Sequence, residues 1–156
     1  MGGRVKILVV DDDESLRKVL TTILEEGGYV VDTANNAKEA IKKSKNKFYN
    51  LALIDIRLPD MAGVKLLTKI CDTTPKMRKI MITGYPTLQN AIAALNRGAH
   101  AYIMKPFNIS TILNIIKEQL KKQEEEREYS QKKVTEFIET RVKELARETP
   151  TYKKSH

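Results

Sequence analysis

LALIDIRLPDMAG, residues 51–63, is the stretch of the chain that decides the fold. Four apolar residues run directly into Asp55, and a loop that contains Pro59 and Gly63 follows. A short apolar run that ends in turn-forming residues predicts a buried strand of a parallel sheet. Open α/β sheets bind their ligands at the carboxyl ends of the strands, so Asp55 is the first candidate functional residue.

The same alternation of strand and helix continues along most of the chain. Apolar strands are predicted at residues 5–10, 29–33, 51–55, 79–83 and 101–104, and apolar residues recur at helical spacing after each of them. Such alternation predicts a parallel sheet with right-handed crossover helices on both faces. The predicted fold class is therefore α/β, a doubly wound five-stranded parallel sheet with strand order 2-1-3-4-5.

The pattern changes after Leu120, where charged residues predominate as far as Lys133. Apolar residues then return at helical spacing, at Val134, Phe137, Ile138, Val142 and Leu145. Pairs such as Glu128 with Lys132 support a helix, and neither Gly nor Pro interrupts residues 114–149, so we predict a long C-terminal helical extension. Its apolar stripe is too short to form a core alone, so we expect it to pack against another surface.

These patterns divide the chain into three parts. We predict a compact domain over residues 1–120, a helical extension over 121–149 that would suit a coiled coil, and a disordered tail over 150–156.

The net charge of +8 is spread along the chain. Residues 1–116 carry 17 basic and 11 acidic side chains, and residues 117–156 carry 11 and 9. Because no basic block stands out, we do not expect a nucleic-acid partner. No apolar run approaches the roughly 18 residues that span a bilayer, and no signal peptide is recognisable. We therefore expect a cytoplasmic protein without a membrane partner.

Polar side chains stand at the ends of four of the five predicted strands. Asp11 and Asp12 follow the first strand, Asp55 ends the third, Thr83 ends the fourth, and Lys105 follows the fifth. In the predicted order the first and third strands are neighbours, so their carboxylates would repel one another unless a cation joined them. Mg²⁺ prefers such oxygen ligands, and a hydroxyl and an ammonium beside it would suit a phosphoryl group.

Four motifs resemble those of a known family. The segments VVDDDES, DIRLPDMAG, MITGYP and AYIMKPF, which begin at Val9, Asp55, Met81 and Ala101, are similar to the CheY-like receiver domain of two-component response regulators. The resemblance covers about residues 4–120 and is specific because the four motifs occur together. It implies a regulator that works by phosphorylation.

The resemblance gives a role to the residues at the strand ends. Asp55 would accept a phosphoryl group from a phosphohistidine on a sensor histidine kinase. Asp11, Asp12 and Asp55 would hold Mg²⁺, with the backbone carbonyl of Arg57 as a further ligand. The protein would catalyse this transfer and its own slow dephosphorylation, without being an enzyme for a separate substrate.

The resemblance also implies a switch. Lys105 would pair with the phosphoryl oxygens, and Thr83 would hydrogen-bond to the phosphoaspartate. Tyr102 would turn inward and reshape the face formed by the fourth helix, the fifth strand and the fifth helix. The Lys105–Pro106 peptide bond would be cis. Ala62 replaces a polar residue often found before the loop glycine, which bears on the hydrolysis rate or on loop capping.

Two other functions of an α/β sheet would need residues that this chain lacks. An aspartate-nucleophile phosphatase would need a second aspartate two residues after Asp55, where this chain has Arg57. A dinucleotide site would need a glycine-rich first turn, where this chain has carboxylates that would repel pyrophosphate. A receiver-fold scaffold that works without phosphorylation stays open, although every acceptor-site residue is present.

The output of the domain also stays open. The residues after 120 are too few and too charged for a helix-turn-helix that binds DNA. We expect a homodimer, formed through residues 134–145 or through the face of the fourth helix, fifth strand and fifth helix, or a downstream protein partner. A further alternative is that the chain is a fragment of a longer regulator.

Overall fold

The computed structural model describes residues 3–70, 76–84 and 87–148, so the tail predicted over 150–156 lies outside the described residues. The chain divides into two compact units, Met1–Gln123 and Glu124–His156. Each unit is described by itself.

The first unit contains a five-stranded parallel sheet in the order β2-β1-β3-β4-β5. The strands are β1 (Lys6–Val10), β2 (Val30–Ala34), β3 (Leu51–Asp55), β4 (Arg78–Thr83) and β5 (Ala101–Met104). The predicted flavodoxin-like fold and strand order are therefore confirmed. β3 lies between β1 and β4, and all five of its residues are buried.

A helix follows each strand. The helices are α1 (Glu14–Glu26), α2 (Ala37–Asn46), α3 (Gly63–Lys69), α4 (Leu88–Asn96) and α5 (Ile109–Glu148). Polar caps fix several of these starts: the side chains of Asp13, Asn36 and Asn108 accept hydrogen bonds from N–H groups in the first turns of α1, α2 and α5. The long C-terminal helix is thus confirmed.

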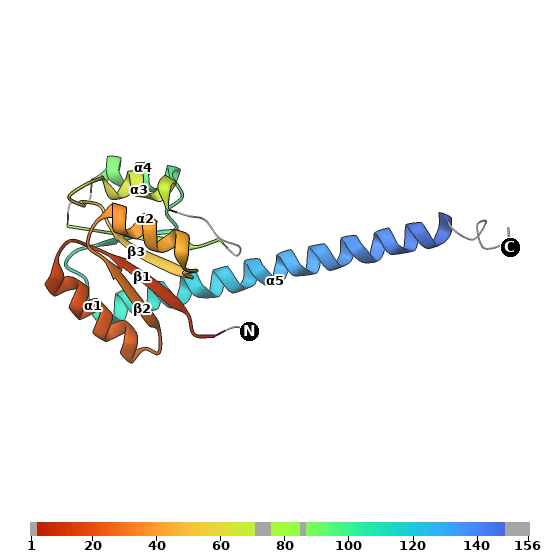
Figure 1. The fold of residues 1–156 in the computed structure, drawn as a ribbon, viewed down its shortest axis with the longest axis horizontal. Helices are drawn as coiled ribbons and strands as arrows, with labels where there is room; N and C mark the ends of the chain where they lie inside the picture. The colour runs from red at the N-terminus through yellow and green to blue at the C-terminus, as the bar shows by residue number, and fades with distance from the viewer. Residues whose placement is uncertain (1–2, 71–75, 85–86, 149–156) are drawn as a thin grey trace. The chain divides into compact units, whose positions relative to one another are not determined.

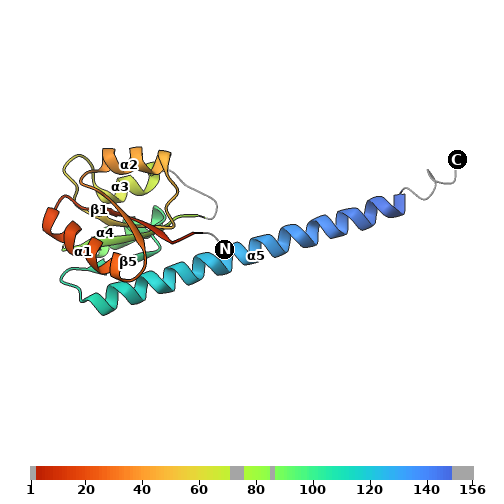
Figure 2. The same cartoon turned by 60° about the horizontal axis from the view of Figure 1, so that its bottom comes forward.

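Helices cover both faces of the sheet, as Figures 1 and 2 show from two directions, and each face carries one apolar core. Alternate strand residues supply the two cores, because successive side chains of a strand point to opposite faces. Leu8, Ala52 and Met81 pack with α2, α3 and α4 on one face. Ile7, Leu53 and Ile80 pack with α1 and with the start of α5 on the other face. The sheet therefore presents only its strand ends and its two edges to other groups.

The second unit contains the helical residues 124–148 of α5, and its apolar side chains are exposed. They form a stripe, hereafter the tail stripe, at Val134, Phe137, Ile138, Val142 and Leu145, each 45–69% exposed. None of the helices in the described residues has the length and apolar character needed to cross a membrane.

Candidate functional site

The carboxyl ends of the central strands bring the predicted acidic residues together. Asp55 is the last residue of β3 and is 8% exposed, and Asp11 follows β1 and is 3% exposed. Asp12 is exposed beside them. One carboxylate oxygen from each of these three residues lies within 4.8 Å of the other two. The neighbouring positions of β1 and β3 explain this cluster, as the predicted strand order implies.

Lys105 supplies the positive charge of the site. It follows β5, and its Nζ lies 3.4 Å from Asp11 Oδ2 and 3.7 Å from Asp55 Oδ1. The Lys105 side chain is 27% exposed, so solvent reaches the ammonium. Its main-chain N–H donates to the carbonyl of Thr83 at 2.7 Å, and the Lys105–Pro106 peptide bond is cis, as the resemblance implies.

The environment of Asp55 disfavours its charged form. Burial raises the pKa of the Asp55 carboxyl, and the neighbouring Asp11 carboxylate raises this pKa further. Lys105 and the main-chain N–H of Arg57, which donates to the carboxylate, lower the same pKa without cancelling the increase. The carboxylate of Asp55 is therefore poorly solvated and lies beside like charge, which favours binding of a cation.

The donor set fits a hard divalent cation. Three carboxylates at this spacing offer the oxygen ligands that Mg²⁺ and Ca²⁺ prefer, whereas no histidine or cysteine contributes to the described cluster. Asp11, Asp12 and Asp55 are therefore the residues that could hold such an ion. Nothing tests the predicted role of the Arg57 carbonyl, which stays a prediction.

The loop after Asp55 folds back on the end of β3. Arg57 pairs with Ala62 in an isolated bridge, and the N–H of Gly63 donates to the carbonyl of Ile56 at 2.7 Å. Ala62 precedes α3 and provides no side-chain cap, which agrees with the predicted consequence for loop capping.

Asp60 ties this loop to the neighbouring helix. Its two carboxylate oxygens accept hydrogen bonds from the N–H groups of Ala37 and Lys38, each at 2.9 Å. These donors belong to the first turn of α2, where N–H groups have no partner within the helix. These hydrogen bonds hold the pKa of the Asp60 carboxyl below its usual range. The loop is therefore held at both Gly63 and Asp60.

Thr83 is the last residue of β4, and Tyr102 lies within the neighbouring strand β5. Thr83 is 1% exposed, and Tyr102 packs against the core on the α2, α3 and α4 face. Burial raises the pKa of the Tyr102 phenol, and the Thr83 hydroxyl is close enough to offset part of that increase. The phenol oxygen nevertheless makes no hydrogen bond of regular geometry with any residue that the structure describes. Tyr102 therefore already points inward, but its hydroxyl has no regular hydrogen-bond partner among the described residues.

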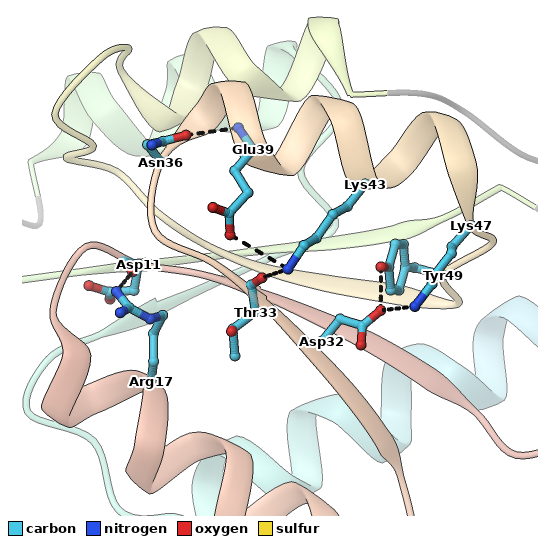
Figure 3. Close-up of polar contacts among 9 residues, drawn as sticks. All are labelled: Asp11, Arg17, Asp32, Thr33, Asn36, Glu39, Lys43, Lys47 and Tyr49. Carbon is cyan, nitrogen blue, oxygen red and sulfur yellow. Dashed lines mark hydrogen bonds and ion pairs between the residues drawn. The ribbon is translucent and has the colours of Figure 1, made fainter.

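Sequence patterns did not indicate Arg17 or the role of Lys43. Arg17 Nη1 donates to the main-chain carbonyl of Asp11 at 2.7 Å (Figure 3). Lys43 donates to the carbonyl of Thr33 and pairs with Glu39 at 3.5 Å. A signal for Arg17 does exist, because a basic residue near a helix N-terminus is unfavourable for the helix dipole and calls for a compensating partner.

Comparisons with known proteins agree with this geometry. The family model described as the response regulator receiver domain matches residues 7–117. The transcriptional regulatory protein ZraR of Klebsiella oxytoca is 36% identical over 119 residues, which cover 76% of this chain and 27% of that protein. The chain thus spans about a quarter of the length of these curated relatives.

Two solved structures are similar to the chain over most of its length. A CheY-like receiver domain protein from Methanospirillum hungatei JF-1 has a TM-score of 0.76 and 49% identity, covering 80% of this chain and 99% of that one. A response regulator from Burkholderia pseudomallei, with a phosphorylated aspartic acid, a calcium ion and citrate, has a TM-score of 0.66 and 34% identity, covering 70% and 64%. With this fold, this cluster of side chains and these matches, the chain belongs to the response regulator receiver domain family.

Proposed function

We propose that Asp55 is the phosphoacceptor of a two-component system and takes its phosphoryl group from a phosphohistidine on a sensor histidine kinase. The observation that carries this proposal is the position of the Asp55 carboxylate, at the end of the buried strand β3 and 3.7 Å from Lys105 Nζ. The phosphorylated aspartic acid in the Burkholderia pseudomallei relative supports it.

The transfer exchanges one bond to phosphorus for another. A carboxylate oxygen of Asp55 bonds to phosphorus while the P–N bond to the donor imidazole breaks, and the imidazole leaves with that electron pair. Lys105 balances charge on the phosphoryl oxygens, since an ammonium binds such oxygens strongly in a partly desolvated site. Thr83 hydrogen-bonds to the product. In this proposal the protein catalyses only its own phosphorylation and slow dephosphorylation.

Asp11, Asp12 and Asp55 would hold Mg²⁺, with the Arg57 carbonyl as a further ligand. The bound ion would neutralise both the carboxylates and the phosphoryl oxygens. The raised pKa of Asp55 supports this part of the proposal, because it reflects burial and like charge that a cation would offset. The calcium ion in the Burkholderia pseudomallei relative also supports a divalent cation.

The signal would leave through the face formed by α4, β5 and α5. Thr83 would move toward the phosphoryl group, and Tyr102 would fill the space beside it. Exposed apolar side chains on this face support a binding role, and they are Leu88, Ile92, Leu95, Met104 and Ile109. The tail stripe offers a second apolar surface. We propose that one or both surfaces form a homodimer or bind a downstream protein.

Phosphorylation can be tested without the kinase. The chain is incubated with Mg²⁺ and acetyl phosphate, and mass spectrometry counts the added phosphoryl groups. We expect one group on the parent and on Asp60→Asn, a matched carboxylate change in the same loop, and none on Asp55→Asn. Beryllofluoride with Mg²⁺ should shift the NMR signals of Thr83 and Tyr102 in the parent and in Asp60→Asn, but not in Asp55→Asn.

A different result would favour the scaffold alternative. If the parent gains no phosphoryl group, beryllofluoride shifts neither residue, and Asp55→Asn behaves like the parent, then phosphorylation is not the function of this site. The structure of the receiver unit would then serve only as a binding surface. Because the curated relatives are much longer, the chain is also compatible with a fragment of a regulator that has a further output region.

A further inference from the structure

Arg17 reaches back from the first turns of α1 to the strand end that carries the acidic cluster. Its Nη1 donates to the carbonyl oxygen of Asp11 at 2.7 Å, as Figure 3 shows. The main-chain N–H of Arg17 also donates to the carbonyl of Asp13, the residue that caps α1, at 3.0 Å. The main-chain bond is the first intrahelical hydrogen bond of α1, and the Arg17 side chain connects this turn of the helix to the end of β1.

Asp11 is held at each of its polar groups. Its N–H donates to the carbonyl of Ala34 at 3.1 Å, and its Oδ1 accepts from the N–H of Asp13 at 2.9 Å. Its Oδ2 faces Lys105. Apart from Lys105, Arg17 is the only residue in these contacts that uses a side chain, and it alone holds the carbonyl. The orientation of the Asp11 peptide therefore depends on the Arg17 guanidinium.

The charge of Arg17 lies near the N-terminus of α1, where it destabilises the helix. The N-terminus of a helix carries a partial positive charge, so a cation there is unfavourable unless another interaction compensates for it. The hydrogen bond to Asp11 is charge-assisted and partly buried, and such bonds are about twice as strong as neutral ones. The interaction with Asp11 thus accounts for a basic residue at this position.

We propose that Arg17 is a positioning residue of the cation site. By holding the main-chain carbonyl of Asp11, the Arg17 guanidinium orients the Asp11 carboxylate for Mg²⁺. This inference rests on the proposed function, because it assumes that Asp11 is a ligand of Mg²⁺. Arg17 itself does not contact the ion or the phosphoryl group.

The proposal and simple electrostatics predict opposite changes in Mg²⁺ affinity when the Arg17 side chain is replaced. A cation beside the acidic cluster repels Mg²⁺, so removal of its charge alone would tighten Mg²⁺ binding. Removal of a positioning contact would weaken it, since partners of metal ligands typically contribute about 10–100-fold to affinity. Arg17 lines an open cleft of about 610 Å³ beside β2, where solvent screens its charge. We therefore expect the geometric effect to exceed the electrostatic one.

The test compares two neutral substitutions on the same helix. Isothermal titration of the full chain with Mg²⁺ measures the dissociation constant of the parent, Arg17→Met, Arg17→Lys and Lys18→Met. Lys18 is the matched control, because it is the next residue and pairs with Glu14 at 3.2 Å, with its side chain 76% exposed. Far-UV circular dichroism and urea unfolding in Mg²⁺-free buffer check that each variant is folded.

We expect Arg17→Met to weaken Mg²⁺ binding by about tenfold, Arg17→Lys to recover most of the loss, and Lys18→Met to match the parent. Saturating Mg²⁺ should restore the rate of phosphorylation by acetyl phosphate in Arg17→Met, because the defect lies in metal binding. If Arg17→Met does not fold, Arg17→Gln, which also removes the charge, provides the same comparison.

Two outcomes would overturn the proposal. If Arg17→Met binds Mg²⁺ as tightly as the parent or more tightly, then Arg17 does not position Asp11. A parent that bound no Mg²⁺ would refute the proposed function and this inference together. The first outcome leaves phosphorylation of Asp55 intact, so the two failures are distinguishable.

Discussion

Gly63 lies directly against the main-chain carbonyl of Asp55, and a Cβ atom at position 63 would stand only 2.1 Å from that oxygen. Gly63 is also the first residue of α3. The helix therefore begins in contact with the peptide group of the residue that we propose to be phosphorylated, which only a residue without a side chain allows.

Gly63→Ala should destabilise the fold and disturb the site. The added methyl must push α3 away from β3, and overpacking of this kind costs about 1–3 kcal/mol of unfolding free energy. Urea unfolding measures the change. Gly84→Ala is the control, because among the described residues a Cβ there would meet only the Lys105 side chain, at 3.9 and 4.0 Å. Equal stability of the two variants would contradict the close contact.

Asp55→Asn should stabilise the Mg²⁺-free protein at neutral pH. Burial, and then the charge of Asp11, raise the pKa of Asp55 in the folded state. Between the pKa of the unfolded chain, about 3.9, and the raised value, the folded state binds more protons, so its stability falls as the pH rises. Asparagine does not titrate, so Asp55→Asn does not lose this stability as the pH rises.

The stability difference between Asp55→Asn and the parent should therefore be largest near neutral pH. It should shrink as the pH falls through the raised pKa and disappear below the unfolded value. Urea unfolding across a pH series in Mg²⁺-free buffer measures it. If this difference in unfolding free energy is independent of pH, or increases as the pH falls, then the folded state does not raise the pKa of Asp55.

Tyr102→Phe should retain or increase stability. The phenol oxygen of Tyr102 is buried without a regular hydrogen bond to any described residue, and such a group costs about 1–3 kcal/mol. Its removal should raise the unfolding free energy by about 1 kcal/mol. Tyr49→Phe is the contrasting variant, because the Tyr49 hydroxyl donates to Asp32 Oδ2 at 2.5 Å, and it should lose about 1–2 kcal/mol. If both variants lose a similar amount of unfolding free energy, then the Tyr102 hydroxyl has a hydrogen-bond partner in the folded protein.

Ile138→Glu should dissociate a dimer formed through the tail stripe. Ile138 is 53% exposed, and a carboxylate there would lose free energy if a second copy buried it. Sedimentation velocity over a range of concentrations compares the parent, Ile138→Glu and Thr140→Glu, which changes the opposite side of the helix. A monomeric parent would exclude the dimer and leave docking of a different protein as the function of the stripe.

The sheet and the central site could be predicted because their signals are local. The alternation of five strands and helices predicted the doubly wound sheet. The polar residues at or just after the strand ends, Asp11, Asp55, Thr83 and Lys105, predicted the edge at which the side chains meet. Side-chain contacts with the main chain of other elements could not be predicted, because no local sequence pattern indicates them. Asp60 binds the N–H of Ala37, 23 residues earlier in the sequence, and Lys43 turns back to the carbonyl of Thr33. Long or loop-borne side chains choose among many partners, and only the packed structure decides which one is near.

The burial of β3 between β1 and β4 has a consequence for how a signal could travel. Amide protons of residues 51–55 bond to neighbouring strands on a sheet whose faces are both covered, so they should exchange with solvent only when the whole unit unfolds. The proposed phosphoacceptor thus stands on a central strand whose residues are all buried. A response to its modification must therefore be carried by the segments around it, and hydrogen exchange should change at Thr83, Tyr102 and the loop of Asp60 while β3 stays protected.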